Sequence, residues 1–292
     1  MNKKIIRVFP CRLPLLPTDD LVYINMPPPA CAMPEHDEVH VYCIFERDKP
    51  RAETLKREWE AATDKPVIIG GPAYRTLCDN FTPGLYTWRR GVIMTSVGGG
   101  NNDCPWNMIH GFEGPIKELP VIDGHVIVDN NFLACSRAHK NNVFEMLKKQ
   151  TGISFYGGLR CDLLDDHFIE AARSLKIGSL WLACDSDESL PAFGEAASKL
   201  IRAGFTRHQI NAWALVGENT ETDERRLIEI YRHGAMPYAV LRAGNDRAAE
   251  YSREWQKFTR RWSVQPGLRE YIRARMRKAV QRPDPITNWL LS

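Results

Sequence analysis

The chain has 292 residues, and its 43% hydrophobic content can fill the core of one barrel and a small extra domain. The formal net charge of +3 is too small to indicate a nucleic-acid partner by itself. No stretch approaches the roughly 20 apolar residues of a membrane span, and residues 1–10 are too short for a secretory segment. These features exclude a membrane protein and predict a cytoplasmic one whose eight cysteines are reduced thiols.

The first predicted elements form a strand, a helix and a second strand. The apolar run 39–45 alternates poorly, which favours a strand buried on both faces. Asp48 and Pro50 suit the start of a helix, and Leu55, Trp59 and Ala62 recur on one side of it. A strand at 67–69 follows. We therefore predict a small α/β domain over residues 1–88.

From residue 91 the same alternation repeats six times. Helical patterns cover 141–149, 166–175, 192–203 and 222–233, and Gly204 and Gly234 follow two of them where a left-handed cap is needed. Such alternation favours a parallel sheet, open or curled into a partial barrel, over residues 89–245, with a helical, basic extension over 246–292. The six apolar strand runs are 92–95, 125–128, 153–156, 179–183, 210–216 and 238–241.

Ligands of parallel α/β proteins lie at the carboxyl ends of the strands, so the loops there carry the candidate site. The first of these loops reads Thr95-Ser-Val-Gly98-Gly99-Gly100, and it continues to Cys104-Pro-Trp-Asn107. The others contain 129–131, 157–162, 184–185, 217–220 and Arg242.

The glycine-rich loop resembles the start of a radical S-adenosylmethionine (SAM) domain. In that family a Thr-Ser-Arg-Gly strand end leads into three cysteines spaced CxxxCxxC, which ligate a four-iron, four-sulfur cluster. The same positions here are Gly100, Cys104 and Asn107, so only Cys104 is retained as a metal ligand. Because neither glycine nor an asparagine amide replaces a thiolate, the cluster is predicted to be absent or non-standard. The sequence thus predicts a degenerate member of the family.

The resemblance extends over about 150 residues. It implies a partial (β/α)6 TIM-like barrel preceded by a trimmed cobalamin-binding-type domain, as in small phage and prophage proteins. Because no Asp-x-His-x-x-Gly signature is evident, cobalamin is not inferred. The matching segments are 126–134, 157–164, 181–185 and 214–217 in the barrel, and 69–72 in the first domain.

The resemblance also implies a SAM-like ligand pocket, and we expect its contacts to lie together at the barrel mouth. Each residue has a structural explanation as well: the glycines can make a tight turn, Asp129 can bind loop backbone, and Arg242 can form an ion pair. The implied contacts are Gly98, Gly99, Asp129, Asn130, Asp185, Gly217 and Glu218.

Two other functions stay open. One is an active iron–sulfur, SAM or metal-dependent enzyme with non-standard ligands, drawn from Asp103, Cys104, His110 and Glu113 or from Cys135, Cys161 and Cys184. The other is nucleic-acid binding by 253–282, where basic residues alternate with Trp255, Phe258, Trp262 and Tyr271. An ordinary amphipathic helix with a solvated basic face gives the same pattern.

Overall fold

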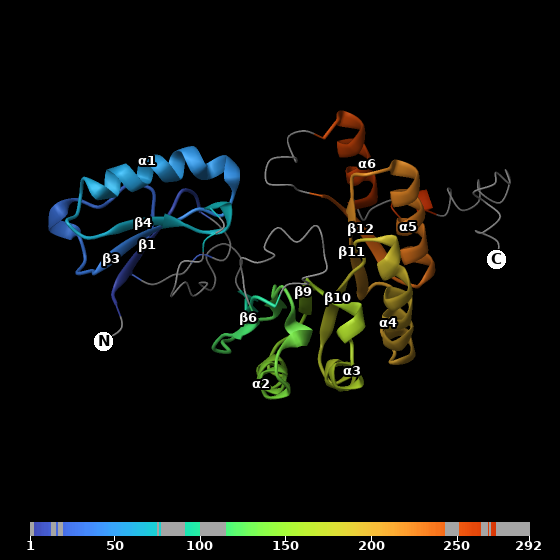
Figure 1. Cartoon of the computed structure of the whole chain (residues 1–292). Coiled ribbons are helices and arrows are strands. Elements are labelled where there is room, and N and C mark those ends of the chain that lie inside the picture. The colour runs from blue at the N-terminus through green and yellow to red at the C-terminus, as the bar shows by residue number, and fades with distance from the viewer. Residues whose placement is uncertain are drawn as a thin grey trace. The chain divides into compact units, whose positions relative to one another are not determined.

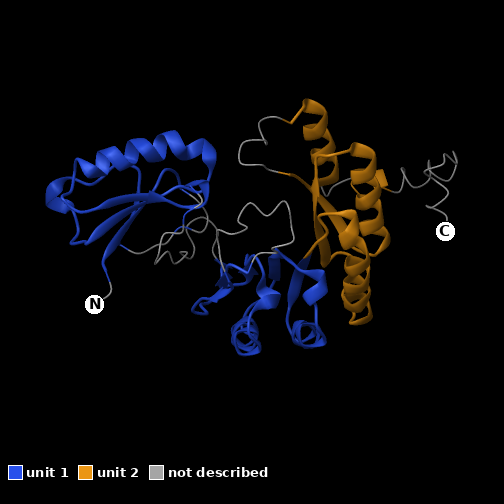
Figure 2. Cartoon of the chain, viewed as in Figure 1, with its two compact units in different colours: residues 1–181, 243–249 blue, residues 182–242, 250–292 orange. Residues whose placement is uncertain are grey.

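The computed structural model describes residues 3–12, 16, 20–74, 76, 91–99, 115–242, 251–263, 268 and 270–272. The chain divides into two compact units, residues 1–181 with 243–249, and residues 182–242 with 250–292 (Figure 2). Parallel sheets with helices between their strands make this an α/β protein, as predicted. The unit boundary falls inside a strand, and the predicted division at residues 88 and 245 stays a prediction.

The N-terminal sheet contains four strands, of which the sequence patterns predicted only two. Its strand order is β2-β1-β3-β4, and β1 pairs in parallel with both β2 and β3. The short strands at its start were missed because Arg7 interrupts one and the other has three residues. The strands are β1 Ile5–Phe9, β2 Val22–Ile24, β3 Glu38–Tyr42 and β4 Val67–Gly70, and helix α1 spans Lys49–Glu60.

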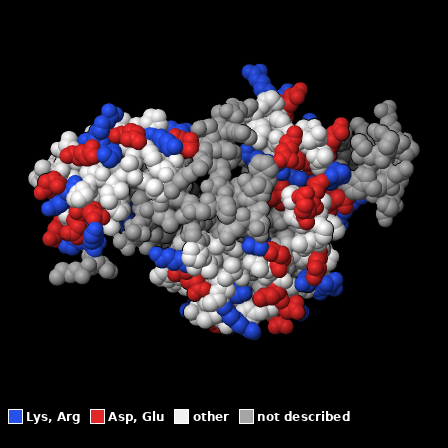
Figure 3. All heavy atoms as spheres, viewed as in Figure 1, with Lys and Arg blue, Asp and Glu red and all other residues white. Residues whose placement is uncertain are grey.

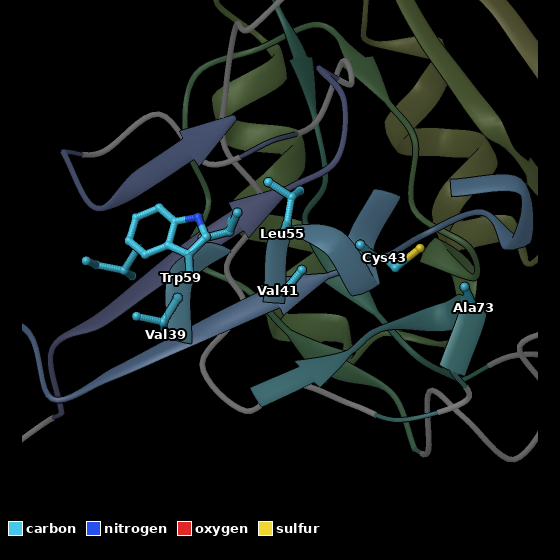
Figure 4. Close-up of a cluster of buried hydrophobic side chains, with 9 residues drawn as sticks. Val39, Val41, Cys43, Leu55, Trp59 and Ala73 are labelled. Carbon is cyan, nitrogen blue, oxygen red and sulfur yellow. The ribbon is translucent and has the colours of Figure 1, made fainter. Parts of the chain in front are cut away.

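Helix α1 packs its apolar stripe onto this sheet (Figure 4). Leu55 and Trp59 are fully buried, and they pack with Val39 and Val41 of β3. The Trp59 ring lies edge-on to Tyr23, and its Nε1 donates to the Asn25 carbonyl at 3.2 Å. The helix is therefore fixed by the side chains whose spacing predicted it.

A six-stranded sheet follows, with the order β12-β11-β10-β9-β8-β5. The strand pairs β5–β8, β8–β9 and β11–β12 are parallel. Each apolar run predicted from residue 91 onward corresponds to one of these strands. They span Val92–Ile93 (β5), Val126–Ile127 (β8), Ile153–Leu159 (β9), Ile177–Ala183 (β10), Ile210–Val216 (β11) and Met236–Leu241 (β12).

Helices alternate with these strands (Figure 1). Ser136, Asp165 and Asn219 cap three of them through side-chain oxygens, which supplies partners for otherwise unpaired helix amides. Gly204 and Gly234 follow two helices with φ of 97° and 88°, as predicted. The helices are α2 Arg137–Leu147, α3 Asp166–Arg173, α4 Leu190–Arg202 and α5 Thr220–Arg232.

The remaining described elements are short, apart from helix α6, which spans Arg253–Ser263 and contacts β12 and α5. Strands β6 (Ser96–Val97) and β7 (Lys117–Glu118) form an antiparallel pair. Single 3-10 turns are Ala30–Ala32, Glu46–Asp48, Pro72–Tyr74, Phe132–Ala134, Cys161–Leu163 and Asp187–Ser189. Among the described residues, none of the helices has the length and apolar content to cross a membrane.

Candidate functional site

Asp129 anchors the loop that carries the resemblance. It follows β8, is 3% exposed, and its Oδ1 accepts the Thr95 backbone N–H at 2.6 Å. Its Oδ2 accepts the hydroxyls of Thr95 and Ser96 at 2.5 and 2.8 Å. Burial raises the pKa of the Asp129 carboxyl, against the lowering effect of these hydrogen bonds. Both carboxylate oxygens are engaged inside the protein, which supports the structural explanation for this residue.

Asn131 fixes the glycine turn itself. Its Nδ2 donates to the Gly99 carbonyl at 2.6 Å, and both Gly98 and Gly99 adopt left-handed backbone, with φ of 79° and 64°. Because a carbonyl needs a donor, this bond also fixes which end of the amide is nitrogen. The Asn131 Oδ1 atom is then buried and has no hydrogen-bond partner among the residues that the structure describes, in a residue that is 3% exposed. We call Thr95, Ser96, Gly98, Gly99, Asp129 and Asn131 the glycine-turn anchor.

The second unit builds its strand-end loops around buried charge. Asp223, in the first turn of α5, is 1% exposed, and its Oδ2 accepts the backbone N–H groups of Gly217 and Glu218 at 2.8 and 3.4 Å. Its Oδ1 accepts from Arg226 at 2.8 Å. The loop after β11 is thereby tied to the helix that follows it.

Arg226 joins this loop to the one after β10. Its guanidinium, 3% exposed as a residue, donates to Asp187 at 3.2 Å, to Asp223 and to the Leu215 carbonyl. Arg225 forms a more exposed ion pair with Asp187. We call Asp187, Glu218, Asp223, Arg225, Arg226 and Arg242 the arginine network.

Arg242 follows β12 and completes the network. It is 7% exposed, pairs with the Glu218 carboxylate, and lies 3.5 Å from the Asp185 carbonyl oxygen. The Glu218 side chain is 58% exposed, so Arg242 fixes a carboxylate that solvent reaches. Burial raises the pKa of Asp185, while the Leu215 amide and the two buried arginines act to lower it.

No protein-family model matches this chain, and no curated protein matches it. The assignment of predicted site residues therefore rests on geometry alone. Gly98, Gly99 and Asp129 meet in the glycine-turn anchor, beside the exposed Asn130. Asp185, Gly217 and Glu218 lie with Arg242 in the second unit. That both sets share one pocket stays a prediction.

Two of the three cysteines that the sequence suggested as replacement ligands, Cys135 and Cys184, are buried, and Cys161 is half-buried, so a replacement cluster site stays a prediction. Burial raises the pKa of the Cys135 thiol to about 11 and that of Cys184 to about 12. No group of three or more His, Cys, Asp or Glu side chains placed to hold a metal occurs among the described residues. Gly100, Asp103, Cys104, Asn107, His110 and Glu113 lie outside those residues.

The described part of the C-terminal extension buries two of its aromatic side chains, while Trp255 and Tyr271 are half-buried. Phe258 and Trp262 are 8% and 0% exposed, so neither presents a ring face to a base. Lys257, Arg260 and Arg261 are exposed on α6. On the face drawn in Figure 3, acidic and basic side chains of the described residues are interspersed. This is the amphipathic packing of an ordinary helix, and nucleic-acid binding stays a prediction.

Sequence reasoning selected the strand-end loop 129–131 but did not imply Asn131 as a ligand contact, and it missed Asp223 and Arg226. Asn131 follows two residues that were implicated, but neither its bond to Gly99 nor its unpaired oxygen has a sequence signal. Asp223 and Arg226 are spaced i, i+3 on α5, which places them on one helix face, although such pairs are usually exposed.

Proposed function

We propose that this chain is a degenerate radical-SAM-like protein that binds a SAM-like ligand at the glycine-turn anchor and does not perform radical chemistry. In this proposal the six-stranded sheet is the partial barrel that the resemblance implies. The observation that carries the proposal is the buried Oδ1 of Asn131, which has no partner in the described part of the chain and lies beside two left-handed glycines.

An unpaired buried acceptor costs about 1–3 kcal/mol, so a ligand that donates to it is bound preferentially. SAM has such donors in its amino group, its ribose hydroxyls and its adenine amine. The turn around Gly98 and Gly99 supports close approach, because glycine has no side chain to keep a ligand away from the backbone. Asp129 contributes by holding Thr95 and Ser96, and we assign it no direct ligand contact.

Absence of the cluster is a separate part of the proposal. Cys104 is the one retained cysteine of the motif, and the neighbouring strand ends supply Cys135 and Cys184 as buried thiols with raised pKa values. Because each cysteine of the motif supplies one ligand, a single retained cysteine leaves a site-differentiated four-iron cluster without two of its usual ligands. We therefore assign the chain no step that depends on one.

Calorimetric titration of the purified chain with SAM and with S-adenosylhomocysteine tests the binding proposal. We expect saturable binding that Asn131→Ala weakens about tenfold, the effect of losing one buried hydrogen bond. Asn141→Ala, at an exposed asparagine of α2, is the matched control and should keep wild-type affinity. Absence of heat with both ligands, or equal affinity for the two variants, would reject the proposal.

A further inference from the structure

Tyr251, just before α6, contacts the loop after β11. Its hydroxyl donates to the Arg242 carbonyl at 2.9 Å. A Cβ atom at position 217 would overlap with that hydroxyl and lie 2.8 Å from the Tyr251 Cζ atom. Gly217 has φ of 135°, where other residues are strained, so glycine is needed here both for its backbone and for the space that Tyr251 fills.

Tyr251 begins a series of aromatic contacts that runs along α6. At the far end, the Tyr271 hydroxyl donates to Glu224 of α5 at 2.8 Å, and the Arg261 guanidinium lies 5.2 Å from the Tyr271 ring centroid. The Ser263 hydroxyl also donates to the Ala239 carbonyl of β12 at 2.8 Å. The series is Tyr251, Trp255, Phe258, Trp262 and Tyr271, with centroid separations of 6.1, 5.4, 6.5 and 5.5 Å.

The same loop is held from two other directions. Asp223 of α5 accepts the backbone N–H groups of Gly217 and Glu218, and Arg242 pairs with the Glu218 carboxylate. Tyr251 in turn bonds to the backbone of Arg242. A side chain from the C-terminal extension therefore contacts both the loop and the arginine that orients its carboxylate.

We propose that Tyr251 is a positioning residue for Glu218, so that the C-terminal extension controls ligand affinity at the loop after β11. The ligand class is an adenosyl compound whose hydroxyl or amine groups donate to Glu218. This inference rests on the proposed function for its adenosyl class of ligand, and it takes Glu218 as a ligand contact because the resemblance implies one at that position. In this inference the C-terminal extension positions a loop of its own unit, whereas a helix with only a solvated basic face would position none.

The test compares full-length Tyr251→Phe with wild type in two measurements. Hydrogen–deuterium exchange of the Gly217 and Glu218 amides reports the loop without any ligand, and we expect exchange about tenfold faster after loss of one hydrogen bond. Calorimetry with S-adenosylhomocysteine should show affinity about fivefold to tenfold weaker at an unchanged melting temperature. Tyr251→Ala should give larger changes in the same direction.

Tyr271→Phe is the control, because it removes a hydroxyl at the far end of the same aromatic series. It should leave exchange at Gly217 and Glu218 and the affinity unchanged. Equal effects of the two variants, or wild-type exchange in Tyr251→Phe, would overturn the inference. If wild type binds no adenosyl ligand while Tyr251→Phe still accelerates exchange, the proposed function fails and the loop-holding contact stands, without its link to affinity.

Discussion

The two compact units stabilise their strand-end loops by different chemistry. In the first, the Asp129 carboxylate is surrounded by neutral donors, the Thr95 amide and the Thr95 and Ser96 hydroxyls. In the second, buried Asp223 faces the charged guanidinium of Arg226, whose exposed fraction is 3%. We therefore expect the first arrangement to tolerate a neutral side chain in place of the carboxylate, and the second to require both charges.

The two units also differ in which polar groups they leave for a ligand. In the glycine-turn anchor both Asp129 carboxylate oxygens accept hydrogen bonds, and the Asn131 Oδ1 atom has no partner among the described residues. The arginine network leaves the Glu218 carboxylate exposed to solvent. Buried aspartates at strand ends are therefore mainly supports in this protein, and the groups next to them are the ligand contacts that we propose.

Removal of Arg226 should have the largest effect. Arg226→Met leaves Asp223 and Asp187 without their buried partner, which typically costs about 3–5 kcal/mol of unfolding free energy. Arg225→Met, the control, breaks a more exposed pair with Asp187 and should cost less than about 1 kcal/mol. Urea unfolding followed by tryptophan fluorescence measures both. A similar small loss in the two variants would contradict the assigned role of Arg226.

Asparagine substitutions test the comparison directly. In Asp129→Asn the amide oxygen can accept from Thr95, while the amide nitrogen donates to the hydroxyl oxygens that previously donated. We expect a loss below about 1 kcal/mol there, and about 2–3 kcal/mol for Asp223→Asn, which leaves Arg226 with less compensating charge. Equal losses in urea unfolding would remove the distinction between the two units.

The secondary structure shows which elements the sequence could predict. The helical spacing of Leu55 and Trp59 predicted α1. Apolar runs such as 210–216 predicted the six later strands. Sequence reasoning missed β1 and β2, which pair with each other, and β1 also pairs with β3, more than 25 residues further along the chain. Local sequence patterns therefore predict the longer elements, whereas a short strand forms only because it pairs with a strand that is distant in the sequence.

The candidate site was predicted less completely. The rule that polar residues at strand ends form sites selected Asp129, Asp185 and Glu218 correctly as strand-end residues. It could not rank them, because the donor that each carboxylate faces comes from another segment, as with Thr95 and Asp129. Asn131 shows the same limit: its unpaired oxygen is a property of the packed loop.

The pH dependence of stability should distinguish wild type from Asp129→Asn. Folding raises the pKa of Asp129 above its ordinary value of about 4. At pH values between the unfolded and the folded pKa, the folded protein therefore binds more protons than the unfolded chain. The unfolding free energy contributed by this group therefore falls as pH rises through that window. Urea midpoints from pH 4 upward should show this decline in wild type and a flatter profile in Asp129→Asn, and parallel profiles would contradict it.

Thiol reactivity compares one buried cysteine from each unit. Burial raises the pKa of Cys135 to about 11 and that of Cys184 to about 12, so both are protonated at pH 8, and Cys184 is the more buried, at 0% against 4% exposed. Alkylation of the native protein by iodoacetamide, read by peptide mass spectrometry, should be slow at both and slowest at Cys184. The exposed Cys31 serves as the reactive reference. Faster labelling of Cys184 than of Cys31 would contradict this burial.

Anaerobic reconstitution with iron and sulfide tests the central claim most directly, that the ligand is bound without a redox cluster. We predict no stoichiometric iron–sulfur cluster and no reductive cleavage of SAM, since the proposed resemblance aligns Gly100 and Asn107 with two of the three cysteine positions. The double variant Gly100→Cys with Asn107→Cys should incorporate more iron than wild type. Binding of about four irons per unmodified chain, the ratio of a cubane cluster, together with SAM cleavage would contradict the account.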